Sequence, residues 1–377
     1  MAQQRTSLFR RVFGHTLFLI NIGVALWLGL CFIAGMVPPY KITWLALFPL
    51  TLPFALLANL FFLFLWLFVA RGKWRVVLPI FMLALCYKLL FISFGWNFFG
   101  KNDMSPAPQR IKIMSWNVHG LGIFDKPKDN GKDTGILAFI RQQAPDILCL
   151  PELYTNKGNT LQPYSARILA MNGYKDFRFQ YDNTLGTKIY LGIGVFSKFP
   201  IRDYQMLALA PGVNALMCDF ELPGKKMLRG CFVHLQSFLL PDKDKATLES
   251  IKNRQAPLEV ARGIGIRSRL LVAFYRRSLQ ADKLAGVLAE SPYPVFMCGD
   301  FNDVPGSYTY QRMRGSLADA FEEKGRGFGR TYNLFSPTLR IDYLFYSGSA
   351  LELLGYYSPR LPFSDHNPVI GNFEIKN

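Results

Sequence analysis

The stretch YPVFMCGDFNDVP, residues 293–305, joins a short apolar run to a cluster of oxygen-bearing side chains. Residues 295–298 are wholly apolar, which predicts a buried strand that ends at a loop. Asp300 and Asn302 lie two apart and point the same way in an extended chain, with Phe301 turned toward the core. Such a pair suits a hard cation or a phosphate. The alternative is an ordinary turn, because Asp, Asn, Gly and Pro all favour turns.

Acidic residues are distributed unevenly and divide the chain into two parts. The first 100 residues contain eight Lys or Arg and no Asp or Glu, while all 26 acidic residues lie beyond them. The remainder carries a formal charge of +9, because 35 Lys or Arg oppose those 26. A moderately basic domain suits an anionic substrate and equally an acidic membrane surface, and does not by itself indicate nucleic acid.

The first part holds three long apolar runs, at residues 16–37, 43–70 and 76–99. Each has the roughly 20 residues that a helix needs to cross a bilayer. A buried soluble helix bundle is the alternative, and the lack of a single carboxylate argues against it. We therefore expect three transmembrane helices over residues 1–100 and contact with the lipid bilayer through residues 16–99.

Basic residues beside these runs predict the orientation. Arg5, Arg10 and Arg11 precede the first run, and residues 71–75 carry three more basic side chains, whereas the first loop offers only Lys41. The positive-inside rule places the N-terminus in the cytoplasm. Three crossings then put the rest of the chain on the extracytoplasmic side of a plasma or inner membrane, and losing one span would reverse this.

Residues 101–110 are interpreted as a linker to a second domain over residues 111–377. Strands are predicted there over residues 111–118, 147–150, 190–197, 200–207, 214–221, 226–235, 295–298, 340–346 and 369–375. Helices are predicted over residues 135–143, 264–290 and 308–321. Two layers of sheet with helices outside would bring the strand ends to one rim.

Polar side chains recur at or near the edges of these apolar runs. They are Asn117, Glu152, His234, Asp300, Asn302 and Asp342, with Asp365 and His366 directly before the last run. One such residue would be an ordinary turn residue, and a lone His is usually structural. So many in one domain indicate a site at the shared rim.

A hairpin is predicted around Pro223-Gly224-Lys225. A two-residue turn at Gly224-Lys225 would place Cys218 opposite Cys231. A disulfide there is possible in an oxidising compartment. Directly opposed strand cysteines often sit poorly for the bond, so the question stays open.

Six motifs of the second part resemble the endonuclease/exonuclease/phosphatase superfamily, which includes DNase I, AP endonucleases, neutral sphingomyelinases and inositol polyphosphate 5-phosphatases. In chain order they are SWNV (115–118), PDILCLPE (145–152), VHL (233–235), GDFND (299–303), RIDY (340–343) and SDHNPV (364–369). The likeness covers residues 111–375. It implies an α/β fold, the DNase I-like four-layered sandwich, and divalent-metal-dependent hydrolysis of phosphate esters. The N-terminal runs are similar to the multi-span region of membrane-anchored bacterial members.

The resemblance also implies a binding site for Mg²⁺ or Mn²⁺. Glu152 would be the principal ligand, with Asn117 close to the metal and Asp365 near it. Such a cation neutralises charge on the non-bridging oxygens of a phosphoryl group under attack.

The remaining motif residues take catalytic roles through the same resemblance. Asp300 would orient or deprotonate the attacking water, and Asn302 would hold the scissile phosphate. His366, polarised by Asp342, and His234 would contact phosphate oxygens from two sides. A carboxylate partner would keep His366 cationic to a higher pH than a free His.

Departures from the family pattern bear on the substrate. His119 follows Asn117-Val118 where AP endonucleases usually carry Asp or Asn, and it is interpreted as a loop residue beside the site. Pro151 replaces a common Gln. Three functions stay open: a phosphodiesterase acting on lipid head groups or other small phosphodiesters, a nuclease acting on extracytoplasmic nucleic acid, and an inactive binding module. No obligate protein partner is evident.

Overall fold

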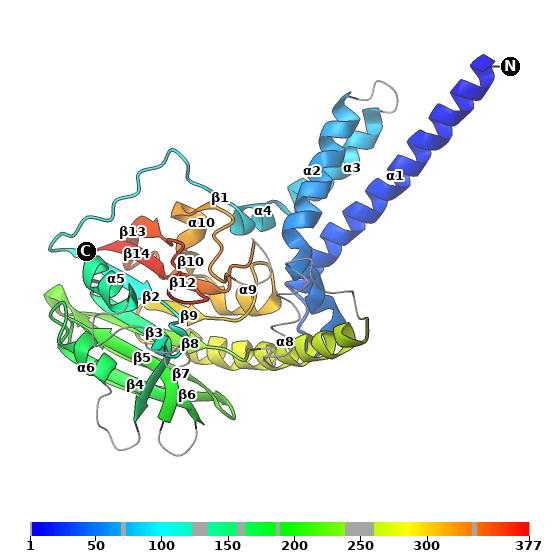
Figure 1. The fold of residues 1–377 in the computed structure, drawn as a ribbon. Helices are drawn as coiled ribbons and strands as arrows, with labels where there is room; N and C mark the ends of the chain where they lie inside the picture. Colours follow the sequence, from blue (N-terminus) through cyan, green and yellow to red (C-terminus); the bar gives the residue numbers. More distant parts are fainter. Residues whose placement is uncertain are drawn as a thin grey trace.

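The computed structural model describes residues 2–68, 73–122, 135–156, 163–185, 189–237, 260–333 and 338–376. Two six-stranded sheets lie face to face, and a group of long apolar helices extends away from one side of them (Figure 1).

The first sheet has the strand order β13-β14-β2-β3-β5-β4, and only β2 and β3 are parallel neighbours. Its strands are β2 (Arg110–Ser115), β3 (Ile147–Asn156), β4 (Asp176–Leu185), β5 (Ile189–Ser197), β13 (Leu351–Tyr357) and β14 (Val369–Ile375). The predicted closing strand is confirmed, whereas β4 and β13 were not predicted. The strand predicted to end before Glu152 continues past it, because a bulge between Leu150 and Leu153 absorbs the extra residues.

The second sheet has the order β10-β12-β9-β8-β7-β6, with β8 and β9 as its parallel pair. Its strands are β6 (Ile201–Ala210), β7 (Val213–Leu222), β8 (Lys226–His234), β9 (Val295–Asp300), β10 (Ala318–Asp319) and β12 (Asp342–Tyr346). The stretch YPVFMCGDFNDVP, residues 293–305, thus contains a central strand and the loop after it. All six residues of β9 are buried.

The hairpin of β7 and β8 corrects the predicted pairing of two cysteines. Leu222 pairs with Lys226, so the turn has three residues rather than two. Cys218 then lies opposite Gly230, and Cys231 lies opposite Met217. A shift of one residue sends a side chain to the other face of a sheet, which separates the two thiols. All six cysteines are free and buried.

Three buried cores separate four layers. The middle core lies between the sheets and includes Cys149 and Cys298. One outer core packs α5 (Gly135–Gln143) and the α6 region (Pro163–Leu169) on the first sheet. The other packs α8 (Val260–Ala289) and α9 (Tyr308–Arg314) on the second. The helix predicted over 308–321 instead ends at Gly315, whose φ of 51° breaks it, and α10 (Ala320–Lys324) follows β10.

The apolar N-terminal region consists of α1 (Ala2–Ala34), the 3₁₀ segment η1 (Thr43–Thr51), α2 (Leu52–Phe68), η2 (Lys73–Val76), α3 (Val77–Leu85) and α4 (Tyr87–Ser93). Two stretches are long and apolar enough to cross a membrane, Val12–Ala34 and Thr43–Phe68. The third predicted run is not one straight helix, because its halves meet at 62° across Cys86, whose backbone is non-helical. The described residues therefore hold two candidate spans, or three if the bent pair counts as one.

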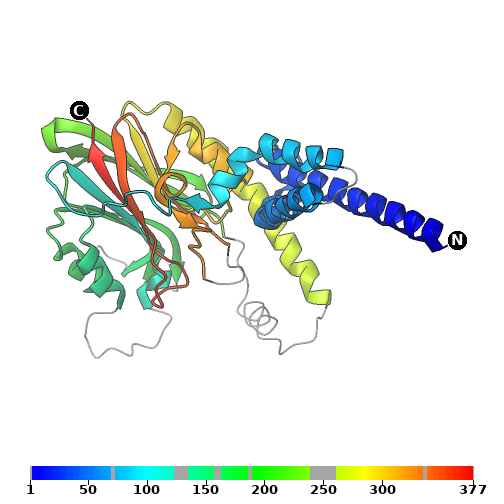
Figure 2. The same cartoon turned by 90° about the horizontal axis from the view of Figure 1, so that it is seen from above.

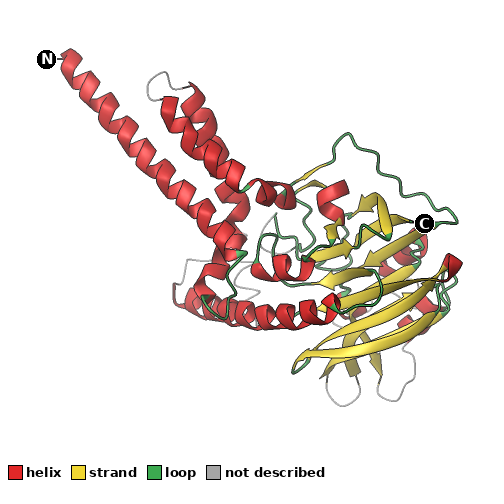
Figure 3. Cartoon of the chain, turned by 180° about the vertical axis from the view of Figure 1, so that it is seen from behind, coloured by secondary structure: helices red, strands yellow, loops and turns green. Residues whose placement is uncertain are grey.

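These helices pack directly on the second domain rather than standing apart from it (Figures 2 and 3). Buried residues of α1, α2 and α4 belong to the same core as β8, β9 and α9. A short strand after α4, β1 (Gly95–Trp96), pairs with β11 (Arg326–Gly327). Within residues 101–110, Asn102 and Asp103 hydrogen-bond to the first sheet through Tyr356 and Asn372.

Candidate active site

Strand register brings three predicted site residues side by side. His234 at the end of β8 pairs with Asp300 at the end of β9, and Asp300 pairs with Asp342 at the start of β12. Asp300 Oδ2 is the meeting point, at 3.1 Å from Asn117 Nδ2, 3.7 Å from His366 Nε2 and 3.9 Å from His234 Nε2.

One side of this meeting point is closed. His366 Nδ1 lies 2.9 Å from Asp342 Oδ2, and both side chains are buried. The Thr331 hydroxyl oxygen accepts the backbone N–H groups of Ile341 and Asp342, which fixes the start of β12. Trp116 Nε1 donates to the His366 carbonyl, 2.9 Å away. The pair is therefore held from both the strand and the loop.

Burial and charge act against each other in this pair. Burial disfavours the charged imidazole, but the carboxylates of Asp342 and Asp300 outweigh it and raise the pKa of His366 to about 10. Burial raises the pKa of the Asp342 carboxyl to about 6, against the opposing charge of His366. An imidazolium between two carboxylates satisfies all three groups, so we take His366 as the cationic partner.

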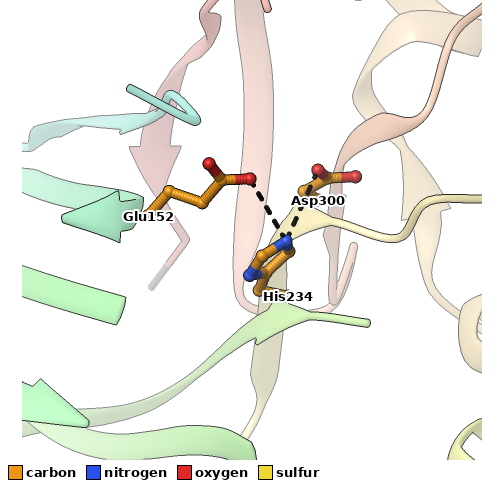
Figure 4. A group of neighbouring side chains, drawn as sticks. All are labelled: Glu152, His234 and Asp300. Carbon is orange, nitrogen blue, oxygen red and sulfur yellow. Dashed lines mark ion pairs between the residues drawn. The ribbon is translucent and has the colours of Figure 1, made fainter. Parts of the chain in front are cut away.

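The other side is more open and is built around Glu152. Its Oε1 accepts from Asn117 Nδ2 at 2.9 Å. The same oxygen lies 3.5 Å from His234 Nε2 (Figure 4). Its Oε2 lies 3.6 Å from His119 Nδ1, which is itself 3.8 Å from Asp365 Oδ1. Burial acts to raise the pKa of Glu152, but the neighbouring imidazoles and Asn117 hold it well below its usual range. Glu152 is therefore ionised.

Backbone strain marks the same residues. Glu152 has a φ of 56° within the β3 bulge, and Asn302 has a φ of 53° just after β9. L-residues seldom adopt such angles, and those that do cluster at functional sites. Gly299 has a φ of 140°, and a Cβ there would lie 2.0 Å from the Val233 carbonyl oxygen. Only glycine lets β9 approach β8 this closely.

The two amide side chains are held in defined orientations. The Asn117 side-chain oxygen accepts the His119 backbone N–H, so its NH₂ group faces the carboxylates of Glu152 and Asp300. In this geometry Asn117 joins the two acids. Asn302 donates to the Leu235 carbonyl through Nδ2 and to Asp300 Oδ1 through its backbone N–H.

All eight predicted residues thus lie at one rim, six of them in direct contact around Asp300 and Glu152. Asn302 joins the cluster through Asp300, and Asp365 joins it through His119. Sequence reasoning underweighted His119, which lies between two carboxylates, and it missed Thr331. The superfamily motif around residue 117 lies next to His119 and so gave a weak signal for it. No motif included Thr331.

Asp303 is the last residue of the GDFND motif. It accepts the Val304 backbone N–H, and its buried side chain lies 3.3 Å from Arg277 Nε of α8. Arg277 also donates to the Gln236 carbonyl at 2.8 Å. Because a buried charge requires a partner, this pair ties the loop after β9 and the end of β8 to α8.

Among the residues that the structure describes, two overlapping groups have metal-ligating atoms within 4.8 Å of one another: Glu152, His234 and Asp300, and Asp300, Asp342 and His366. In the second group His366 and Asp342 already satisfy each other. In the first group the imidazole is too far from either carboxyl group for a hydrogen bond, and an oxygen of Glu152 and one of Asp300 face the same gap. Carboxylate oxygens suit Mg²⁺ or Mn²⁺, so the Glu152 and Asp300 oxygens of the open group fit a divalent cation.

A model of the endonuclease/exonuclease/phosphatase family matches residues 114–366, and a model described as a domain of unknown function matches residues 12–99. An endonuclease/exonuclease/phosphatase from Beutenbergia cavernae DSM 12333 is similar in structure, with a TM-score of 0.51 and 21% identity over 71% of this chain and 72% of its own. The human Nocturnin catalytic domain with bound sulfate has a TM-score of 0.49 and 18% identity, over 72% of this chain and 97% of its own. ANGEL2, a 2',3'-cyclic phosphatase, has a TM-score of 0.46 and 16% identity, over 75% of this chain and 98% of its own. No curated protein matches. The first structure confirms the predicted DNase I-like α/β fold.

Proposed function

This chain belongs to the endonuclease/exonuclease/phosphatase family and is a phosphoric ester hydrolase; on that premise we propose that it is a phosphodiesterase that uses a divalent cation while its N-terminal helices anchor it in a membrane. The observation that carries the proposal is the shared carboxylate of Asp300. It lies between the buried Asp342–His366 pair and the open Glu152–His234 gap.

Each side chain has a role that follows from its position. Asp300 is the base that orients and deprotonates the attacking water, because its Oδ2 faces both halves of the site. His366, kept cationic by Asp342, donates to a phosphate oxygen and stabilises the charge that develops there. His234 does the same from the neighbouring strand, and Asn302 positions the phosphate beside it.

Glu152 would hold Mg²⁺ or Mn²⁺ at the gap that it shares with Asp300, with Asp365 farther out. When bound, such a cation neutralises the non-bridging oxygens of the phosphate. Asn117 fixes the two carboxylates that face the gap.

Full-length protein in nanodiscs tests this with bis(p-nitrophenyl) phosphate and its monoester counterpart. We expect diester hydrolysis with Mn²⁺ or Mg²⁺, loss on chelation, and loss in Asp300→Asn. Asp203→Asn, an exposed acid on β6, is the matched control. Activity that survives both chelation and Asp300→Asn would refute the proposal. Cleavage of plasmid or RNA in preference to small diesters would instead favour the nuclease.

We also propose that the domain faces the extracytoplasmic side, which follows if the bent α3–α4 pair completes a third span. All six native cysteines are buried, so they give little background for thiol labelling. A Tyr204→Cys variant places one thiol on exposed β6. Its labelling by a membrane-impermeant maleimide in intact cells is the expected result. Labelling only after lysis would place the domain in the cytoplasm.

A further inference from the structure

The end of the first candidate span touches a loop of the active-site rim. Val12–Ala34 is followed directly by Gly35, where an added Cβ would lie 2.7 Å from the Gly306 carbonyl oxygen. An added Cβ on Gly306 would lie 2.9 Å from Leu52 Cδ2, at the start of α2, and 3.4 Å from Leu89 Cδ2 of α4. The backbones of Gly35 and Gly306 therefore lie in direct contact, with no side chain between them.

A buried arginine makes a second connection. Arg340 donates to the Ile92 carbonyl of α4 at 2.7 Å and pairs with Asp319 at 2.8 Å, with both side chains buried. The Tyr310 hydroxyl also donates to Asp319. Arg340 lies two residues before Asp342, so the end of the apolar region is joined to the strand that holds the His366 partner.

These contacts fix the height of the site above the bilayer. Asn302 is four residues from Gly306, and an extended chain covers at most about 3.6 Å per residue, so the two lie within about 14 Å. The head-group layer on each side of a bilayer is roughly 5–8 Å thick. A span that ends at Ala34 therefore keeps Asn302 within about 14 Å of the end of that span, a distance of the same order as the head-group layer.

The side of the site next to α8 offers space for a substituent of the phosphate. A depression of about 320 Å³ begins at Gln236, two residues after His234, and is lined by Gln236, Ser237, Ser268, Arg269, Val272, Ala273 and Arg276. Its basic and apolar side chains suit an anionic ester with an apolar portion. Arg277 fixes this wall to the site through Gln236 and Asp303.

We propose that the substrate is a phosphodiester lipid of the same bilayer in which the helices are embedded, and that the contacts at Gly306 and Arg340 set the height at which its phosphate is met. This rests on the proposed phosphodiesterase function. In the reaction the water oxygen bonds to phosphorus as one P–O ester bond breaks. The water proton passes to Asp300, the leaving alkoxide is protonated by solvent, and the products are a phosphomonoester and an alcohol.

The test compares lipids in the same vesicle with lipids in another. Full-length protein is reconstituted with Mn²⁺ into vesicles of phosphatidylethanolamine, phosphatidylglycerol and phosphatidylcholine, and protein-free vesicles of isotopically labelled lipid are added. Phosphomonoester formation is followed in each population, with bis(p-nitrophenyl) phosphate as the soluble substrate. Because anchoring raises the local lipid concentration, we expect same-vesicle lipid to react roughly 10²-fold faster.

The outcomes separate the two proposals. Hydrolysis of bis(p-nitrophenyl) phosphate with intact lipids, or equal rates on both vesicle populations, overturns the lipid inference and leaves the phosphodiesterase standing. Cleavage of plasmid or RNA in preference to lipid would also overturn the lipid inference. Inactivity on every diester overturns the phosphodiesterase itself, and the inference with it.

Two glycine variants test whether the contact at Gly306 sets the height of the active site above the bilayer. Gly306 has a φ of +80°, and Gly306→Ala introduces a methyl group against Leu52. Gly224 has a similar φ of +77°, so Gly224→Ala carries a similar backbone penalty, but its methyl group would meet no atom within 4 Å. We expect Gly306→Ala to slow lipid hydrolysis about tenfold or more and bis(p-nitrophenyl) phosphate hydrolysis little, and Gly224→Ala to change neither. Equal losses on both substrates in Gly306→Ala would show damage to the site and contradict a role in setting height.

Discussion

The two halves of the site share Asp300 but are built differently. On one side the His366 and Asp342 side chains are 6% and 2% exposed and lie 2.9 Å apart. On the other, Glu152 and His234 are 21% and 18% exposed, and their closest approach is 3.5 Å. The first half is complete with protein atoms alone. The second brings carboxylates and an imidazole together without joining them, which is the arrangement expected where a cation completes the contacts.

The largest effect should come from the open half. Glu152→Gln keeps an oxygen that can accept from Asn117 but removes the charge that the cation needs. Several kcal/mol of transition-state stabilisation would be lost, so we expect kcat/KM to fall by about 10³-fold. Calorimetric titration with Mn²⁺ should show the loss of binding in parallel.

The same variant has a built-in check on folding. At 100 times its Kd, a bound cation stabilises the native state by about 2.7 kcal/mol. Mn²⁺ should therefore raise the Tm of the wild type and leave that of Glu152→Gln unchanged, while the two have similar Tm values in chelator. An equal Mn²⁺-induced Tm shift in both proteins would place the cation elsewhere.

A smaller loss is expected from the closed half. Asp342→Asn removes the anion that keeps His366 charged and oriented, and we expect kcat/KM to fall by about 10²-fold, the lower part of the range for a misplaced acid or base. Affinity for Mn²⁺ should be nearly unchanged, because Asp342 satisfies His366 rather than the open gap. A change in Mn²⁺ affinity as large as that of Glu152→Gln would erase the distinction between the halves.

The closed half also predicts how stability depends on pH. The pKa of His366 is raised from 6.5 to about 10, so its stabilising contribution is complete below pH 6.5 and is lost as the pH rises through about 10. In chelator, the free energy of unfolding should fall over this window more steeply in the wild type than in His366→Asn/Asp342→Asn. The double variant replaces both charges and leaves no unpaired ion. Parallel curves from urea unfolding would show that the pair is not charged.

The sequence predicts that these polar side chains meet at one rim because of how strands end. Asp300, Asp342 and His234 follow or begin apolar runs, and hydrogen-bonded strands deliver such positions to one rim. Local pattern could not predict the three-residue turn at Pro223–Lys225. It also could not predict the bulge at Glu152, since both depend on which register buries the better face.

Long-range contacts lay further outside what the sequence could predict. The Arg277–Asp303 pair joins residues 26 positions apart, and Arg340 reaches Ile92 across 248 positions. A basic residue in an amphipathic helix gives no sign that its partner is a loop acid. Nor does apolar composition distinguish a helix surrounded by lipid from one whose end packs on a sheet domain, as α1 does here.

The smallest effect should come from His119, at the outer edge of the open half. Its side chain is 40% exposed and lies 3.6 Å from Glu152 and 3.8 Å from Asp365. Surface ion pairs of this kind contribute about 1 kcal/mol or less. We therefore expect His119→Gln to lower kcat/KM by roughly fivefold at most. It should also weaken Mn²⁺ binding only slightly, because Asn117 still holds Glu152. A loss comparable to that of Glu152→Gln would make His119 part of the cation site itself and move the boundary of the open half outward to Asp365.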